Sequence, residues 1–247
     1  SPFELAEQSR FSLEANGSPH ELVISGQHNT NLERLKTDIE KICQTEINMF
    51  GSAPFQNYTF MTMATGNSYG GLEHCNSTSL ITPRDDLPKA DEAEEPSKDY
   101  QRFLGLCSHE YFHSWLVKFI RPENFANYDL QKEGYTSLLW IFEGFTSYYD
   151  DLILLRSGVI SQTSYLELLK AQIDRYLQNP GRAIQSVSES SFDAWIKFYR
   201  QDENSNNAGT SYYNKGSLVA LCLDLGLRLR GSSLDAVMRR LYENAQP

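Results

Sequence analysis

Residues 109–113, with the sequence HEYFH, combine side chains that could bind a metal and transfer a proton. The apolar residues around them predict one helix from Tyr100 to Phe119, so His109 and His113 lie on one helix face, about one turn (~6 Å) apart. Zn²⁺ binds neutral imidazole nitrogens, and a catalytic zinc site uses three protein ligands and keeps one position for water. Glu110 fits the general base that takes a proton from this water. The alternative is a chance pair of histidines, but in an apolar helix unpaired histidines are costly. We therefore predict one zinc ion per chain.

Two glutamates compete for the place of the third zinc ligand. Glu133 lies 20 residues beyond His113, a common spacing for this motif, whereas Glu143 lies 30 residues beyond it. The environment favours Glu143, because its apolar neighbours imply burial, and a buried carboxylate needs a cation partner or a shifted pKa. A ligand on a second helix is also held more rigidly than one in the polar loop around Glu133. We therefore predict that His109, His113 and Glu143 bind the zinc ion.

A second candidate segment is residues 70–74, with the sequence GGLEH. Paired glycines at a strand edge let another backbone approach closely, and an exposed edge can accept an extended peptide as an added strand. Gly70 and Gly71 are therefore candidate substrate-binding residues, and Glu73 could meet the free ammonium group of a peptide. The alternative for this segment is a plain β-bulge with a solvated glutamate.

Strands and helices that could position these residues follow from the sequence periodicity. Residues 3–25 resemble a β-hairpin with a turn at Asn16-Gly17, and we expect residues 1–29 to be the remnant of an N-terminal β-domain. Residues 30–33 resemble a capping-box start to a helix that ends at Gly51, and we expect residues 30–247 to form one domain that carries the predicted zinc site, the catalytic domain. Residues 58–63 and 77–81 read as paired strands. Further helices are expected over residues 135–156, 161–178, 212–230 and 233–244.

Composition limits the classes of function. The chain has 247 residues, 40% of them hydrophobic and 22% charged, with a formal net charge of -10. Such an acidic chain without a cluster of lysines and arginines is not expected to bind nucleic acid. No apolar run reaches the ~20 residues of a membrane span. Four widely spaced cysteines suggest free thiols in a reducing compartment, so we expect a cytoplasmic protein, or a periplasmic or secreted one if a signal segment was removed.

With these residues in hand, the chain resembles the glycyl aminopeptidase family of zinc metallopeptidases, which are related to aminopeptidase N and thermolysin. The resemblance rests on four segments: GGLEH at 70–74, HEYFHSW at 109–115, FEGFTSYY at 142–149 and YYNKG at 212–216. It implies an α+β fold with a thermolysin-like catalytic domain, mostly helical with a small mixed sheet. It also implies that Glu143 is the third zinc ligand. Family members usually carry a PDZ domain as well, and we expect that domain to be absent from this chain.

The resemblance assigns roles to further residues. Tyr213 corresponds to the tyrosine that supports the transition state in aminopeptidase N, and Glu73 to the glutamate that holds the substrate's amino group. We therefore expect a zinc aminopeptidase that releases small N-terminal residues, glycine or alanine, from peptides. Because His74 stands where aminopeptidase N usually has asparagine, a zinc endopeptidase is the alternative. An inactive peptide-binding scaffold is a third possibility, against which Glu110 and Tyr213 both argue.

Overall fold

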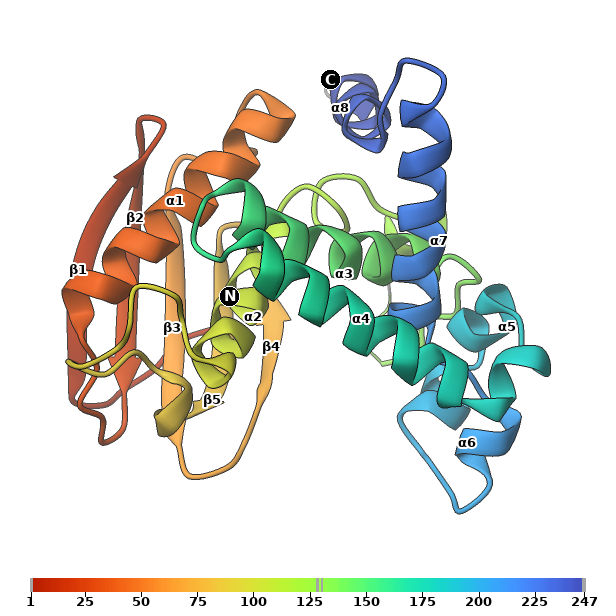
Figure 1. Cartoon of the computed structure of the whole chain (residues 1–247), viewed down its shortest axis with the longest axis horizontal. Coiled ribbons are helices and arrows are strands. Elements are labelled where there is room, and N and C mark those ends of the chain that lie inside the picture. The colour runs from red at the N-terminus through yellow and green to blue at the C-terminus, as the bar shows by residue number, and fades with distance from the viewer. Residues whose placement is uncertain (1, 128, 130, 246–247) are drawn as a thin grey trace. The chain divides into compact units, whose positions relative to one another are not determined.

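The computed structural model of the protein describes residues 2–127, 129 and 131–245. The chain divides into two compact units. We call them unit 1, which consists of Ser1–Phe119 and Asp150–Tyr165, and unit 2, which consists of Ile120–Tyr149 and Leu166–Pro247. Helices combine with one small mixed sheet, so the predicted mixed α and β architecture is confirmed (Figure 1).

The sheet of unit 1 is formed by five strands, β1 (Gln8–Ala15), β2 (Ser18–Ser25), β3 (Tyr58–Thr65), β4 (Gly70–Glu73) and β5 (Ser77–Pro83). Their order in the sheet is β1-β2-β3-β5-β4. β3 pairs in parallel with both β2 and β5, whereas β1 and β4 pair antiparallel with their neighbours. The segment with the paired glycines is thus an edge strand, in which Gly71 lies opposite Leu80 and Glu73 opposite Thr78.

The predicted hairpin is confirmed as the first two strands of this sheet. Asn16 and Gly17 form its turn with φ values of 48° and 80°, because a two-residue turn that matches the strand twist needs positive φ at both positions. β2 continues directly into pairing with β3, and both belong to unit 1. The origin of residues 1–29 in a separate β-domain stays a prediction.

Helix α1 (Leu32–Phe50) packs on β1 through an apolar face that includes Leu35, Ile39 and Ile42. Its N-cap is Asn31, one residue after the predicted Thr30, because the Asn31 side chain accepts a hydrogen bond from the backbone N–H of Arg34. The helix ends at Gly51, as predicted, where φ is 91°.

Helix α2 (Lys98–Phe112) packs on β4 and β5 and carries the HEYFH segment. The prediction that it extends to Phe119 is wrong. Trp115 leaves the helix axis to stack on Phe50, with ring centroids 4.7 Å apart, and donates its indole N–H to the carbonyl oxygen of Ser52. Val117 has a φ of 117°, which no helix accommodates.

Unit 2 is helical. Two helices have residues in both units: α3 (Leu139–Arg156) begins in unit 2 and ends in unit 1, and α4 (Gln162–Gln178) begins in unit 1 and ends in unit 2. α3 begins four residues later than the predicted Tyr135. The other helices are α5 (Val187–Phe192), a π-helical turn (Ala194–Phe198), α6 (Ser205–Ala208), α7 (Tyr212–Arg228) and α8 (Leu234–Ala245). Short 3₁₀ turns cover Arg84–Asp86, Glu123–Phe125 and Pro180–Ala183.

All four cysteines have free thiols. Cys43 and Cys107 are buried in unit 1, and burial raises the pKa of both thiols well above its usual value. Cys75, in unit 1, and Cys222, on α7 in unit 2, are exposed.

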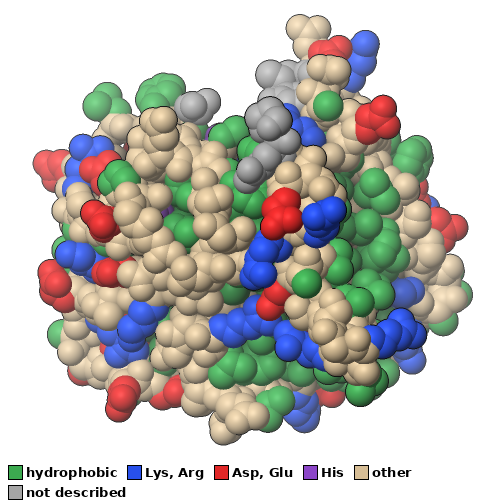
Figure 2. Space-filling view, turned by 90° about the horizontal axis from the view of Figure 1, so that it is seen from above, with side chains coloured by type: hydrophobic (Ala, Val, Ile, Leu, Met, Phe, Trp, Pro, Cys, Tyr) green, Lys and Arg blue, Asp and Glu red, His purple; other side chains and the backbone are tan. Residues whose placement is uncertain are grey.

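Side chains of both charges occur on the face that Figure 2 shows, with hydrophobic side chains between them. Single exposed apolar residues are normal on protein surfaces. Within the described part of the chain, every helix is too short or too polar to cross a membrane.

Candidate metal centre and active site

Helix α2 holds its two histidines in a fixed orientation because most of the helix is buried. Ser97 caps its start by accepting a hydrogen bond from the N–H of Tyr100. Tyr111, which is fully buried, stacks on Phe60 of β3 with ring centroids 5.6 Å apart. His113 caps the end of the helix, and its N–H donates to the carbonyl oxygen of His109. The predicted four-residue spacing on one helix face is therefore confirmed, although the helix ends at the second histidine.

The two imidazole rings lie close together and are each fixed through Nδ1. Their centroids are 4.7 Å apart and their planes nearly perpendicular, at 87°. Nδ1 of His113 lies 2.9 Å from the carbonyl oxygen of Leu116, which can only accept, so this nitrogen carries the proton. Nδ1 of His109 lies 3.0 Å from Oδ2 of Asp150. A neutral imidazole with its proton on Nδ1 has its lone pair on Nε2, as a zinc ligand requires.

Asp150 was not predicted as a site residue. It belongs to the part of α3 in unit 1, and its carboxylate contacts His109 across 41 positions of sequence. Burial raises the pKa of Asp150, while the hydrogen bond from His109 opposes that rise. One sequence signal was present: Asp150 follows Glu143 by seven residues, which is two turns of a helix.

Glu110 is buried, with 5% of its surface exposed, and its side chain reaches under the edge strand. A Cβ atom placed on Gly71 would lie only 2.3 Å from Oε1 of Glu110. The same atom on Gly70 would meet nothing closer than 3.9 Å. A side chain at position 71 would thus displace Glu110, whereas one at position 70 would not. The predicted edge strand and the predicted base lie in direct contact.

Glu73 lies near the base but already has a partner. Potential ligand atoms of Glu73, Glu110 and His113 lie within 4.8 Å of one another. The Glu73 carboxylate forms an ion pair of 3.0 Å with Nζ of Lys118, and both side chains are largely buried. Lys118 was not predicted as a site residue, because a single lysine near the end of the expected helix carries no signal of its own.

Glu143 lies in unit 2, on the first half of α3, and is half-buried. The next residue, Gly144, lies at a close crossing of α3 with α7: a Cβ there would lie 2.6 Å from the Cα of Gly216. A Cβ on Gly216 would lie 2.6 Å from the carbonyl oxygen of Trp140. Only glycines at both positions let the two helices approach this closely.

Tyr213 is in the first turn of α7, three residues before this crossing. Burial raises the pKa of the Tyr213 phenol, and the negative charge of nearby Glu143 raises it further. The phenol therefore stays protonated at neutral pH and can donate a hydrogen bond. The hydroxyl oxygens of Tyr213 and Tyr199 are 3.2 Å apart. Tyr199 was missed in the sequence, since the only signal there is a cluster of aromatic residues.

The rejected ligand, Glu133, is exposed and accepts a hydrogen bond from the hydroxyl of Tyr135. Its loop precedes α3 in unit 2. Because His109 and His113 belong to unit 1 and Glu143 to unit 2, the complete set of three zinc ligands stays a prediction.

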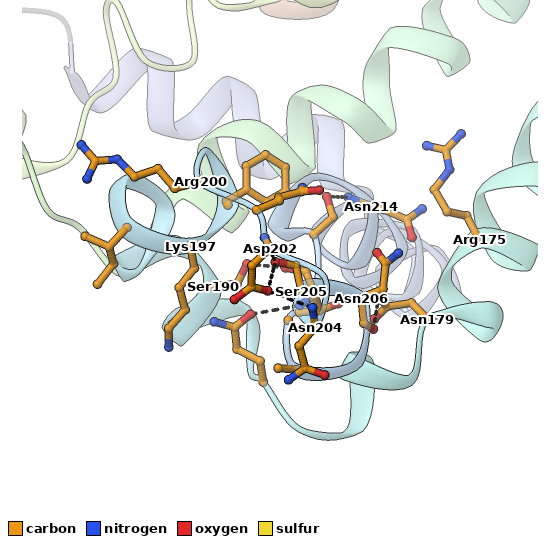
Figure 3. Close-up of a pocket in the computed structure, with 18 residues that line it drawn as sticks. Arg175, Asn179, Ser190, Lys197, Arg200, Asp202, Asn204, Ser205, Asn206 and Asn214 are labelled. Carbon is orange, nitrogen blue, oxygen red and sulfur yellow. Dashed lines mark hydrogen bonds between the residues drawn. The ribbon is translucent and has the colours of Figure 1, made fainter.

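A separate cavity of about 350 Å³ lies in unit 2 beside the first turn of α7 (Figure 3). Its polar groups largely bind one another: Asp202 accepts hydrogen bonds from the Asn204 N–H and the Ser205 hydroxyl. The labelled cationic side chains, Arg175, Lys197 and Arg200, point away from its centre in Figure 3. None of the predicted site residues lines this cavity.

Comparison with known proteins gave one family and several related structures. Residues 102–219 match the family of M61 glycyl aminopeptidases. A crystal structure of an aminopeptidase N family protein from Idiomarina loihiensis is 48% identical, with a TM-score of 0.94, over 96% of this chain and 41% of that one. The chain thus spans less than half the length of this relative. No curated protein matches the chain.

Two more distant structures share the fold. An M1 zinc metallopeptidase from Deinococcus radiodurans is 14% identical, with a TM-score of 0.58 over 96% of this chain and 44% of that one. Yeast LTA4 hydrolase, solved in complex with bestatin, is 17% identical, with a TM-score of 0.55 over 97% of this chain and 33% of that one.

The stretch that matches the family, residues 102–219, contains both histidines, Glu110, Glu143 and Tyr213, and the resemblance to the glycyl aminopeptidases is confirmed.

Proposed function

We propose that this chain is the catalytic part of a zinc-dependent metallopeptidase with a thermolysin-like catalytic domain. Among peptidases, we propose an aminopeptidase that releases small N-terminal residues, glycine or alanine, from peptides. The observation that carries the proposal is the histidine pair on α2. Both imidazoles hold Nδ1 against an acceptor, which prepares Nε2 for a metal, and Glu110 lies between them in a buried position.

Glu143 is the third ligand in this proposal. α3 is one continuous helix, so Glu143 and Asp150, seven residues apart, project from the same side of it. Asp150 contacts His109 directly, and a carboxylate two turns earlier on that side suits the same metal. Two imidazoles and one carboxylate are a usual donor set for a catalytic zinc ion, which leaves room for a water molecule.

Residues of the chain then have separate roles in peptide hydrolysis. A zinc ion held by His109, His113 and Glu143 would act as a Lewis acid: it would polarise the peptide carbonyl and lower the pKa of the attacking water. Glu110 accepts the proton of the attacking water and returns it to the leaving amine. Tyr213, kept protonated by burial and by Glu143, donates a hydrogen bond to the carbonyl oxygen as negative charge develops on it. The edge of β4, with Gly71, accepts the peptide backbone.

Glu73 is proposed to hold the ammonium group of the peptide's N-terminus. Its ion pair with Lys118 supports this in one respect, because an ammonium group already lies 3.0 Å from this carboxylate. The substrate's amine then replaces the lysine. The same ion pair favours the second candidate function, an endopeptidase, because Glu73 already has a compensating charge and a substrate without a free amine meets no unpaired acid there.

The test compares zinc-loaded protein on matched peptides with free and acetylated N-termini, alongside the variants Glu110→Gln and Glu73→Gln. We expect Glu110→Gln to keep zinc but lose nearly all turnover, because an amide cannot accept the proton. We expect Glu73→Gln to lower kcat/KM on free-amine peptides on the order of 30-fold to 1,000-fold, and to leave acetylated ones nearly unchanged. Equal losses on both would replace the aminopeptidase assignment with the endopeptidase one, and turnover by Glu110→Gln would remove the peptidase mechanism.

A panel of aminoacyl amides on the same protein determines the preferred residue, for which only the family name suggests glycine or alanine. The cytoplasmic location and the stoichiometry of one zinc per chain stay predictions, and metal analysis checks the second.

A further inference from the structure

Three tyrosines of unit 2 form a chain of hydroxyl groups that ends at Tyr213. The Tyr212 hydroxyl donates to the oxygen of Tyr199 at 3.3 Å, and the hydroxyl oxygens of Tyr199 and Tyr213 are 3.2 Å apart. We propose that Tyr199 is a positioning residue, which orients the Tyr213 hydroxyl so that its proton points toward the substrate carbonyl. This inference rests on the proposed function, in which Tyr213 is the donor.

The direction that we propose for this chain starts at its buried end. Tyr212 is 1% exposed, and a buried hydroxyl must place its proton on an acceptor, here the oxygen of Tyr199. Either hydroxyl of the Tyr199–Tyr213 pair can donate, and in our proposal Tyr199, which accepts from Tyr212, donates to the oxygen of Tyr213. The Tyr213 oxygen then acts as an acceptor on this side, and its proton points elsewhere. A hydroxyl that accepts one hydrogen bond also becomes a better donor in the next.

Local packing holds Tyr199 at the right place for this role. It directly follows the π-helical turn Ala194–Phe198, a type of irregularity that often occurs at functional sites. The Phe198 ring packs against Tyr199, Tyr212 and Tyr213, with centroid distances of 5.2, 4.8 and 5.7 Å. Tyr212 and Tyr213 stack at 4.6 Å. The three hydroxyl groups are thus ordered by a shared aromatic neighbour.

Exposure separates this role from a purely structural one. Tyr199 is 64% exposed, so its ring adds little to the core of unit 2. Loss of its hydroxyl leaves the ring contact with Phe198 unchanged. The variant Tyr199→Phe therefore removes the hydroxyl that contacts Tyr213 and accepts from Tyr212, and it leaves the ring contacts in place.

The experiment measures kcat and KM of zinc-loaded protein on one free-amine peptide for four variants: Tyr199→Phe, Tyr213→Phe, the double variant, and Tyr135→Phe as a control. Tyr135 has a hydroxyl in the same unit that donates to Glu133 and not to a tyrosine. We expect Tyr199→Phe to lower kcat on the order of 10-fold with KM unchanged, the effect of one oriented hydrogen bond. The double variant should match Tyr213→Phe alone, because the positioning acts only through Tyr213.

The outcomes distinguish this inference from the proposed function. If Tyr213→Phe retains full kcat, the proposed role of Tyr213 fails. If Tyr213→Phe is impaired while Tyr199→Phe equals the control, Tyr213 keeps its role and the positioning by Tyr199 is overturned. Losses that multiply in the double variant, or a raised KM with unchanged kcat in Tyr199→Phe, also overturn it, because Tyr199 would then act on the substrate directly. Equal melting temperatures of Tyr199→Phe and the control confirm that the fold is intact.

Discussion

The contact between Gly71 and Glu110 makes a single methyl group a sharp test of the active site. In Gly71→Ala, the new Cβ would lie 2.3 Å from Oε1 of Glu110, and 2.5 and 2.6 Å from its Cδ and Cγ. Ordinary van der Waals contact begins at 3.4 Å, so one of the two partners must move by about 1 Å. β4 is fixed to β5 by backbone hydrogen bonds, whereas Glu110 is a side chain. We therefore expect Glu110 to move.

A displacement of about 1 Å at a catalytic group costs on the order of 10²-fold in rate. Gly71→Ala should therefore lower kcat about 10²-fold, while zinc content stays at the wild-type level, because the three atoms nearest to the new methyl group all belong to Glu110 and not to a zinc ligand. The assay is steady-state hydrolysis of a free-amine peptide by zinc-loaded protein, with metal analysis of the same samples. Gly66→Ala is the control, because a Cβ there meets nothing within 4 Å and the turn lies outside the site. A wild-type kcat in Gly71→Ala would refute the assignment of Glu110 as the base.

Two further predictions concern the metal. Glu143→Ala should lose zinc while Glu133→Ala retains it, as measured by metal analysis after dialysis, and the opposite result would move the third ligand to the loop. Asp150→Asn should weaken zinc binding about 10-fold to 100-fold in a competition titration, because the amide cannot stabilise the His109 imidazole as a carboxylate does. Asp151→Asn, at the neighbouring position of α3, serves as its control, and equal affinities in the two variants would assign Asp150 a structural role only.

Local signals in the sequence predicted most elements of the fold. Asn16-Gly17 predicted the hairpin turn and Gly51 predicted the end of α1. Glycine and asparagine tolerate a positive φ better than other residues, so the residue type itself carries this signal. The end of α2 could not be predicted in this way. Trp115 is apolar and continues the helical pattern, yet its partners, Phe50 and the carbonyl of Ser52, lie about 60 positions earlier in the chain. Long-range packing outweighed the local pattern there.

In the candidate site too, residues with a local sequence signal could be predicted and residues in long-range contact could not. His109, Glu110 and His113 follow from spacing on one helix. The long-range partners in the site do not follow from spacing. The bond from His109 to Asp150 joins residues 41 positions apart, and the ion pair between Glu73 and Lys118 joins residues 45 positions apart. Tyr199 is closer to Tyr213 in sequence, but a π-helical turn has no simple periodicity by which to recognise it.

The distribution of the four thiols has a practical consequence. Cys43 and Cys107 are buried with raised pKa values and so react slowly with alkylating reagents, whereas Cys75 and Cys222 are exposed. Each unit therefore carries one accessible thiol, Cys75 in unit 1 and Cys222 in unit 2. The unaltered protein accepts one fluorescent dye per unit without mutagenesis. Energy transfer between donor and acceptor dyes at these two positions then reports any change in the separation of the units when a peptide or a metal binds.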